Sequence, residues 1–179
     1  MSTYKFRKAD VRDLDRIAEI YNRILDLEEA GKATVGWVRD IYPTKETALE
    51  GIDAGEMFVL EDENTVVAAA RINREQVPEY ADAAWEHPEA PDDKVMVLHT
   101  LVVDPTLSGK GYGSAFVRFY ESYAKENGCP YLRMDTNERN AAARRLYAHL
   151  GYREAGIVTC TFNGIRSVHL VCLEKTLQD

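Results

Sequence analysis

The stretch that decides the fold is DPTLSGKGYGSAF, residues Asp104 to Phe116, which carries glycine at positions Gly109, Gly111 and Gly113. Glycine is used where the backbone needs a positive φ, or where another group comes too close for a side chain. An apolar strand precedes the stretch and an amphipathic segment follows it. In a strand–loop–helix arrangement of this kind, free backbone N–H groups and the helix dipole favour binding of an anion at the start of the helix. The stretch therefore predicts either a phosphate-binding loop or a glycine-rich loop without a ligand.

Composition narrows the class of protein. The chain has 179 residues, of which 45% are hydrophobic and 29% charged, as in one globular domain. It has no apolar run of the ~20 residues that a membrane span needs, and MSTYKFRKAD lacks the apolar core of a secretory signal.

The net charge of −8 argues against a nucleic-acid partner. Three cysteines without metal-binding spacing predict reduced thiols and no metal site. The cytoplasm is the expected location, with no membrane partner.

Hydrophobic periodicity predicts a mixed α/β domain of alternating strands and helices. Strands are expected at 3–9, 56–61, 65–73, 95–104, 131–136, 157–162 and 165–174, and helices at 9–32, 44–55, 114–128 and 137–151. The strand at 95–104 is apolar on both faces except for His99 and Thr100, which is typical of a central strand covered on both sides. The polar segment 74–94 is expected to form an insertion or lip.

Local signals add two details. Thr44 is followed three residues later by Thr47 in place of an acid, so its capping box is expected to be incomplete. Asn163–Gly164 is expected to form the turn of a C-terminal hairpin in which Cys160 faces Ser167. Cys172 then falls on the other face of its strand, so no Cys160–Cys172 disulfide is expected.

Two nucleotide-binding motifs fit the glycine stretch poorly. A P-loop needs Ser or Thr after Lys110, where Gly111 stands. The dinucleotide motif G-x-G-x-x-G has Ser114 in place of its third glycine, although Asp135 stands about where a ribose-binding acid would. The residues DPTLS also separate the strand from the glycines, whereas the dinucleotide turn follows its strand directly. A dinucleotide-binding oxidoreductase stays open as a third hypothesis.

Two blocks in the second half of the chain resemble the GNAT superfamily of acyl-CoA-dependent N-acetyltransferases. The segment LHTLVVDPTLSGKGYGSAFV matches the family's strand, its V-x-P element and its Arg/Gln-x-x-Gly-x-Gly/Ala loop, with Ser108 where Arg or Gln is usual. The segment TNERNAAARRLYAHLGY matches the second block. Its matching residues are Asn140, Ala143, Leu146, Tyr147, Leu150, Gly151 and Tyr152.

The resemblance implies a single-domain α/β fold with a mixed, mostly antiparallel central sheet flanked by helices. It also implies a V-shaped splay between the fourth and fifth strands. The domain would cover residues 1–179, with a cofactor core at 95–152, acceptor-side elements at 10–55 and 76–94, and the C-terminal hairpin at 156–175.

The implied function is N-acetyl transfer from acetyl-CoA to a primary amine, by direct attack through a tetrahedral intermediate. The acceptor would be a small-molecule or peptide amine. Family members are often dimers, so a homodimer is compatible with the resemblance. The alternative is a catalytically silent acyl-CoA-binding or sensor domain on the same fold, which turnover of CoA with an amine would exclude.

The resemblance also assigns cofactor contacts. The CoA diphosphate would rest on backbone N–H groups of the glycine loop, and the pantetheine arm would lie beside the preceding strand. A backbone N–H near Leu101 or Val102 would face the thioester oxygen, and Asn140 would bind the pantetheine arm. The expected cofactor-binding residues are Leu101, Val102, Val103, Ser108, Gly109, Lys110, Gly111, Tyr112, Gly113, Ser114, Asn140 and Tyr147.

Acetyl transfer needs a base and an acid. An alkylamine with a pKa of ~10.4 is mostly protonated at neutral pH, and a leaving thiolate benefits from a proton donor. Tyr147 is the expected acid by resemblance, although its position on an apolar stripe also fits a core aromatic. His99 is the expected base, since the arylalkylamine branch has histidine at the matching strand position, but a structural histidine fits as well. Glu86 and His87 in the lip are rival bases.

Three aromatic residues are candidates for the acceptor pocket. Trp37 and Tyr42 lie in the loop after the first predicted helix, which borders the acceptor in the family, and Trp85 lies in the lip. Loop aromatics equally serve as packing anchors, so the sequence leaves both roles open.

Overall fold

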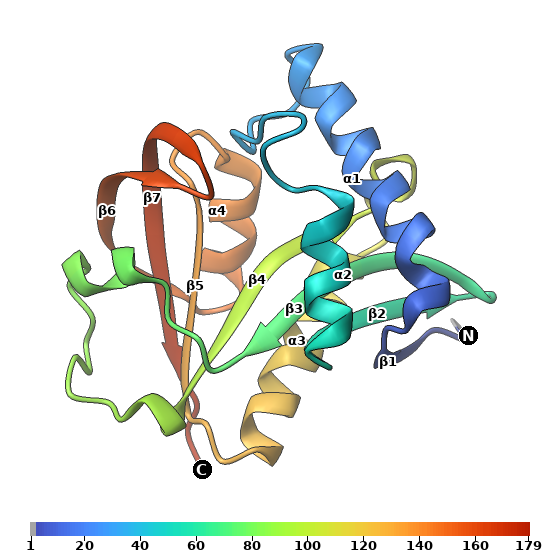
Figure 1. Ribbon diagram of the computed structural model, residues 1–179. Helices are drawn as coiled ribbons and strands as arrows, with labels where there is room; N and C mark the ends of the chain where they lie inside the picture. Colours follow the sequence, from blue (N-terminus) through green and yellow to red (C-terminus); the bar gives the residue numbers. More distant parts are fainter. Residues whose placement is uncertain (1–2) are drawn as a thin grey trace.

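The computed structural model describes residues 3–179 and has a seven-stranded sheet covered by helices (Figure 1). The strands lie in the order β1-β2-β3-β4-β5-β7-β6, and all neighbours are antiparallel except β4 and β5. This confirms the predicted fold class. The strands are β1 (Lys5–Lys8), β2 (Met57–Asp62), β3 (Thr65–Asn73), β4 (Val95–Val103), β5 (Tyr131–Asn137), β6 (Arg153–Phe162) and β7 (Ile165–Thr176). The α-helices are α1 (Leu14–Glu29), α2 (Lys45–Asp53), α3 (Tyr112–Glu126) and α4 (Ala141–His149).

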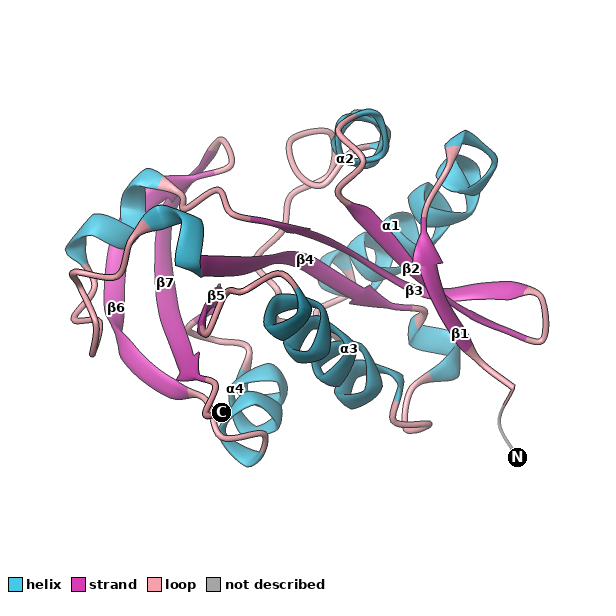
Figure 2. Cartoon of the chain, turned by 90° about the horizontal axis from the view of Figure 1, so that it is seen from below, coloured by secondary structure: helices cyan, strands magenta, loops and turns pink. Residues whose placement is uncertain are grey.

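The helices form a layer on each side of the sheet (Figure 2). Helices α1 and α2 cover one face, where Ile17 and Ile20 pack against strand residues such as Val59. Helices α3 and α4 cover the other face, where Phe116 and Tyr120 are fully buried. The central strands are apolar on both faces because each face is covered by a helix layer.

Strands β4 and β5 pair over only part of their length. Val95–Leu98 pair with Tyr131–Met134, and beyond the pair Leu98–Met134 the two strands part. Thr100 has a φ of +52° at an irregularity in β4. In the described part of the chain, neither β3 nor β5 is in register with Thr100 or Leu101. The predicted splay between the fourth and fifth strands is therefore present, and it leaves backbone N–H and C=O groups free of the sheet.

The predicted start of α4 and the predicted cap of α2 need correction. Helix α4 begins at Ala141 rather than at 137, because Asn137 still pairs in β5 and Asn140 caps the helix by accepting the N–H of Ala143 at 3.2 Å. The capping box of α2 is complete, because the Thr47 hydroxyl accepts the N–H of Thr44 at 2.9 Å. A threonine hydroxyl thus replaces the usual acid.

The C-terminal hairpin differs from prediction by one residue. Cys160 faces Val168, not Ser167, because a bulge between Cys160 and Phe162 shifts the register. A one-residue shift moves a side chain to the other face. Cys160 and Cys172 therefore pack in the same apolar cluster, contrary to the predicted opposite faces. Both thiols are free, as expected.

Asp104 connects α1 to the turn that follows β4. Its side chain is 1% exposed, and its carboxylate accepts from Arg16 and Arg23 at 2.6 Å each. The carboxylate also accepts the N–H of Thr106 at 2.9 Å. Burial alone would raise the pKa of Asp104, but the hydrogen bonds from Thr106 and Arg16 hold it below its usual value. The first residue of DPTLS therefore fixes the start of the glycine loop against α1.

We predict that Asp104→Asn lowers the free energy of unfolding by ~3 kcal/mol, because it leaves two guanidinium groups without their buried counter-charge. Urea unfolding at pH 7 measures the change. The control is Asp26→Asn, since Asp26 pairs with Arg39 on the exposed side of α1 and should contribute little. Since the pKa of folded Asp104 is depressed, its contribution is present above pH ~4 and is lost as the pH falls further. Equal effects of the two substitutions would contradict this account.

Candidate active site

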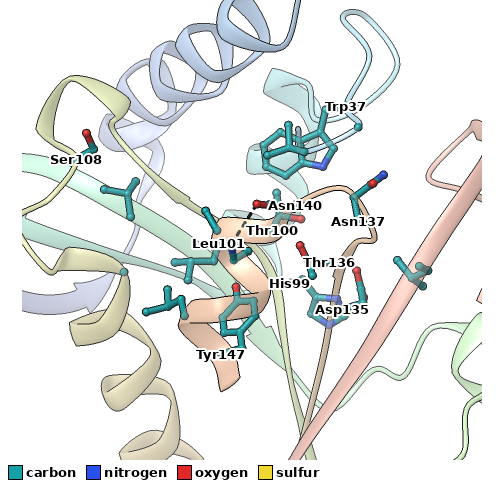
Figure 3. Close-up of a pocket in the computed structure, with 18 of the residues that line it drawn as sticks. Trp37, His99, Thr100, Leu101, Ser108, Asp135, Thr136, Asn137, Asn140 and Tyr147 are labelled. Atoms are coloured by element: carbon teal, nitrogen blue, oxygen red, sulfur yellow. Dashed lines mark hydrogen bonds between the residues drawn. The ribbon is translucent and has the colours of Figure 1, made fainter. Parts of the chain in front are cut away.

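A cavity of about 630 Å³ opens where β4 and β5 part (Figure 3). One half, here called the glycine half, is formed by the end of β4, the loop 107–114 and α4. The other, the aromatic half, is formed by loop residues 35–42, His99 and Thr100 of β4, the end of β5, Val77 and the tip of the β6–β7 hairpin. The splay thus creates a channel through the sheet that elements from both ends of the chain line.

The three glycines have two different roles. Gly109 and Gly111 have φ values of +82° and +79°, and open space surrounds the position that a Cβ would take on each. Gly111 precedes α3 as its N-cap and supplies no side-chain cap, so the first N–H groups of the helix are free for an anion. Gly113 serves packing, because its Cβ position lies 3.5 Å from Leu146 of α4.

Most of the predicted cofactor-binding residues line this half. Leu101 and Val103 face the cavity, together with residues 108–114. Val102 does not line it, because its side chain is buried in the α1–α2 layer on the other face of the sheet. The Tyr112 side chain turns into the core, where its hydroxyl donates to Asp62. The side chains of Val102 and Tyr112 are therefore not available to a ligand in the cavity.

Tyr147 and Asn140 close the inner wall of the glycine half. Tyr147 is 7% exposed, and its hydroxyl points toward Leu101 in Figure 3. In the described part of the chain this hydroxyl has no hydrogen-bond partner, while every fully buried side-chain N or O atom has one, so the hydroxyl is open to the cavity. Burial, with a contribution from Asp135, raises the pKa of Tyr147. The Asn140 oxygen caps α4, which leaves its NH₂ group for a ligand.

His99 is held in one tautomer by a short chain of hydrogen bonds. The Asn73 amide NH₂ donates to Glu56 at 2.9 Å, so its oxygen must accept from Nε2 of His99, at 2.7 Å. The unprotonated nitrogen is then Nδ1. Burial, followed by the charge of Arg71, lowers the pKa of His99 to about 4. The imidazole is therefore neutral at physiological pH and retains one proton-accepting nitrogen.

The predicted acceptor residues divide into two groups. Trp37 and Tyr42 line the aromatic half, and their rings pack edge to face with centroids 6.3 Å apart. The Tyr42 hydroxyl forms a hydrogen bond with the hydroxyl of Thr100. Trp85 lies outside the cavity, buried between Tyr80 and the Arg133 guanidinium.

The rival bases in the lip also lie outside the cavity. Glu86 is exposed, and its backbone N–H donates to Glu174 at 3.0 Å. His87 packs against Tyr131 on the outer side of β5. Val77 lines the cavity, but the part of the lip around Trp85 turns away from it because the Trp85 ring packs in the apolar cluster around Val95.

Asp135 lines the cavity at a place that the sequence does not predict. Asp135 lies in the aromatic half, where its carboxylate accepts from the Tyr80 hydroxyl at 2.7 Å, and burial raises its pKa to about 6. The sequence signal is a lone acid at the end of an apolar strand, at about the place of the ribose-binding acid in a dinucleotide motif. The structure places Asp135 in the half of the cavity away from the glycine loop.

The chain belongs to the acetyltransferase (GNAT) family, whose model matches residues 15–152. This membership replaces the oxidoreductase hypothesis. An uncharacterized N-acetyltransferase of Bacillus subtilis (strain 168), YhfO, is 25% identical over 154 residues, covering 83% of this chain and 89% of YhfO.

Solved structures share the fold. A GNAT-family acetyltransferase of Streptococcus agalactiae superposes with a TM-score of 0.80 at 19% identity, covering 98% of this chain and 96% of the other. The yncA protein of Salmonella typhimurium, solved with its cofactor acetyl-CoA, superposes with a TM-score of 0.71 at 20% identity, covering 99% of this chain and 96% of the other. Among residues 3–179, no helix has the length and apolarity to cross a membrane.

We predict that the imidazole of His99 titrates near pH 4 instead of near 6.5. Between these values the unfolded chain binds a proton that the folded protein does not, so stability falls as the pH is lowered from 6.5 to 4. Imidazole proton NMR measures the titration, and the His99→Gln spectrum identifies the resonance by its loss. A midpoint near 6.5 would refute the described environment of His99.

Proposed function

We propose that the protein is an N-acetyltransferase that moves the acetyl group of acetyl-CoA to a primary amine by direct attack through a tetrahedral intermediate. The observation that carries the proposal is the shape of the channel. A turn with free N–H groups lies at one end of the glycine half and the Tyr147 hydroxyl at its inner wall, beside a stretch of β4 that is not in register with its neighbours. Family membership supports the same reaction.

The glycine half fits acetyl-CoA. Free N–H groups and open space at Gly109 and Gly111 suit a diphosphate, which a side chain at either position would obstruct. Backbone groups around Leu101 can bind the amide-bearing pantetheine arm much as a neighbouring strand would, and the Asn140 NH₂ group can add a hydrogen bond. The solved complex of yncA with acetyl-CoA supports this assignment. Acetyl-CoA supplies the activated acyl group as a thioester.

The chain's own groups provide the proton transfers and the charge stabilisation. His99 offers Nδ1 as the proton acceptor for the attacking amine, directly or through water. A backbone N–H at Thr100 or Leu101 can stabilise the oxyanion of the intermediate. The Tyr147 hydroxyl stays protonated and donates to the leaving sulfur as its negative charge develops.

The test is release of free thiol from acetyl-CoA in the presence of a panel of primary amines. The proposal predicts amine-dependent release and an N-acetylated product detected by mass spectrometry. Acetyl-CoA binding without turnover on any amine would instead identify a silent acyl-CoA-binding domain.

Gly111→Val is predicted to weaken CoA binding at least ~100-fold, the equivalent of about two charge-assisted hydrogen bonds. The valine side chain would enter the open space at the start of α3. Gly31→Val is the matched control, because Gly31 also has a positive φ, +70°, and open surroundings but lies outside the cavity. Both variants bear similar backbone strain, so calorimetry that finds equal CoA affinities for the two would refute the anion-binding turn.

Tyr147→Phe is predicted to lower kcat by ~100-fold, the usual scale of general acid catalysis. It keeps the buried ring, so stability should change by only ~1 kcal/mol, and CoA affinity should change little. A more acidic thiol is a better leaving group and depends less on a proton donor. With a thioester of such a thiol, the loss of kcat in the variant should therefore be smaller. An equal deficit with both thioesters would show that Tyr147 positions the cofactor without acting as an acid.

A further inference from the structure

The proposed reaction gives no role to Asp135, although it lies at the point where the sheet opens. Leu98 and Met134 form the last pair of β4 and β5, so His99 and Asp135 are the next residues on the two strands. Leu98 and Met134 pack into the core under α3. Since side chains alternate along a strand, Asp135 faces the other side of the sheet, where Tyr80 and the aromatic half lie.

The Asp135 carboxylate has one oxygen without a protein partner. Its Oδ2 accepts from the Tyr80 hydroxyl at 2.7 Å, and within residues 3–179 no other hydrogen bond or ion pair reaches the carboxylate. Every fully buried side-chain N or O atom of those residues has a partner, so Oδ1 is open to the cavity. A partly buried carboxylate without a cation is costly in the free protein, and a ligand cation would relieve that cost.

The surroundings of Asp135 contain no cation to balance it. The titratable groups near it are the hydroxyls of Tyr42, Tyr80 and Tyr147, the carboxylate of Glu79, the thiols of Cys160 and Cys172, and His99. Of these only His99 can carry a positive charge, and its lowered pKa keeps it neutral. The negative charge at this wall is therefore uncompensated at neutral pH.

The rest of the aromatic half is largely apolar. Its apolar side chains include Trp37, Tyr42, Val77, Phe162, Ile165 and Leu170. Among the described residues that line the whole cavity, the only lysine or arginine is Lys110, which belongs to the glycine half. The aromatic half therefore offers no cationic side chain to a carboxylate or phosphate on the acceptor, although Thr136, Asn137 and Asn163 carry neutral hydrogen-bond donors. Burying an anion there without a counter-charge would be unfavourable.

Two contacts between separate segments lie beside the aromatic half. Gly36 lies directly against the Asn137 side chain at the end of β5. A Cβ on Gly164, at the tip of the β6–β7 hairpin, would lie 3.2 Å from Ile41, so the hairpin tip meets the loop after α1. These contacts limit the width of the aromatic half on that side, which favours a small molecule over a protein chain as its occupant.

We infer that the aromatic half binds a small, apolar primary amine that carries no anionic group, and that the Asp135 carboxylate holds its ammonium group. The inference rests on the proposed function and names its acceptor class. The ammonium would donate to Asp135 Oδ1 at the wall beside His99, while the apolar part of the amine packs against Trp37 and Phe162. Tyr80 acts as the positioning residue by fixing the carboxylate through Oδ2.

The first experiment uses pairs of acceptors that differ only by a carboxylate: 2-phenylethylamine against phenylalanine, and tryptamine against tryptophan. Thiol release should give a kcat/KM at least ~10-fold higher for each amine than for its amino acid, a difference of ~1.4 kcal/mol. Calorimetric titration of 2-phenylethylamine into the protein–CoA complex should show binding that phenylalanine does not. Preference for the amino acids would overturn the inferred acceptor class.

The second experiment compares Asp135→Asn with the exposed control Asp82→Asn. Asparagine keeps the size of the side chain and can still accept from Tyr80, so the fold should persist, which thermal unfolding checks. Asp135→Asn should raise the KM for 2-phenylethylamine at least ~10-fold through loss of a charge-assisted contact, with CoA affinity unchanged. Asp82→Asn should change neither. An unchanged amine KM and unchanged calorimetric affinity in Asp135→Asn would overturn the role of Asp135.

The results also separate this inference from the proposed function. If the protein binds acetyl-CoA and acetylates only amino acids, peptides or polyamines, the inferred acceptor class is wrong and the acetyltransferase proposal stands. If no acetyl-CoA binds, both are wrong.

Discussion

The parting of β4 and β5 after Leu98 and Met134 is the constraint on which the site depends. Each strand keeps its outer neighbour beyond that pair: Val102 and Val103 stay in register with β3, and Asp135–Asn137 stay in register with β7. The irregularity at Thr100, with its positive φ, lets β4 turn away without losing β3. An interrupted ladder leaves backbone groups that need partners, and a bound cofactor arm can supply them.

The remaining parts of the site are held by contacts that fix this opening from its two sides. Asp104 ties the end of β4 to α1 through Arg16 and Arg23, so the loop that carries the free N–H groups starts from a fixed point. Across the sheet, Asn73 fixes the tautomer of His99 and Tyr80 fixes the carboxylate of Asp135. The side chains to which the proposal assigns the reaction thus come from strands and a helix, and the contacts that hold them lie outside the cavity.

The glycine pattern and the resemblance to the family predicted much of the fold. The positive φ values at Gly109 and Gly111, the element order and the splay agree with the glycine pattern and the family blocks. Features set by backbone irregularities and by distant contacts were missed. The hairpin bulge moved Cys160 to the face of Cys172, and Asp104 appeared only as a spacer because its partners are 81 and 88 residues away. Trp85 and Glu86 were placed at the acceptor because hydrophobic pattern alone does not say which layer a lip joins.

The most direct measurement of the central claim is a crystal structure of the protein with bound CoA. The account predicts the diphosphate on the backbone N–H groups of residues 109–114, the pantetheine arm between β4 and β5 beside Leu101, and the thiol near the Tyr147 hydroxyl. CoA bound outside the channel, or β4 and β5 closed against each other along their whole length, would contradict it.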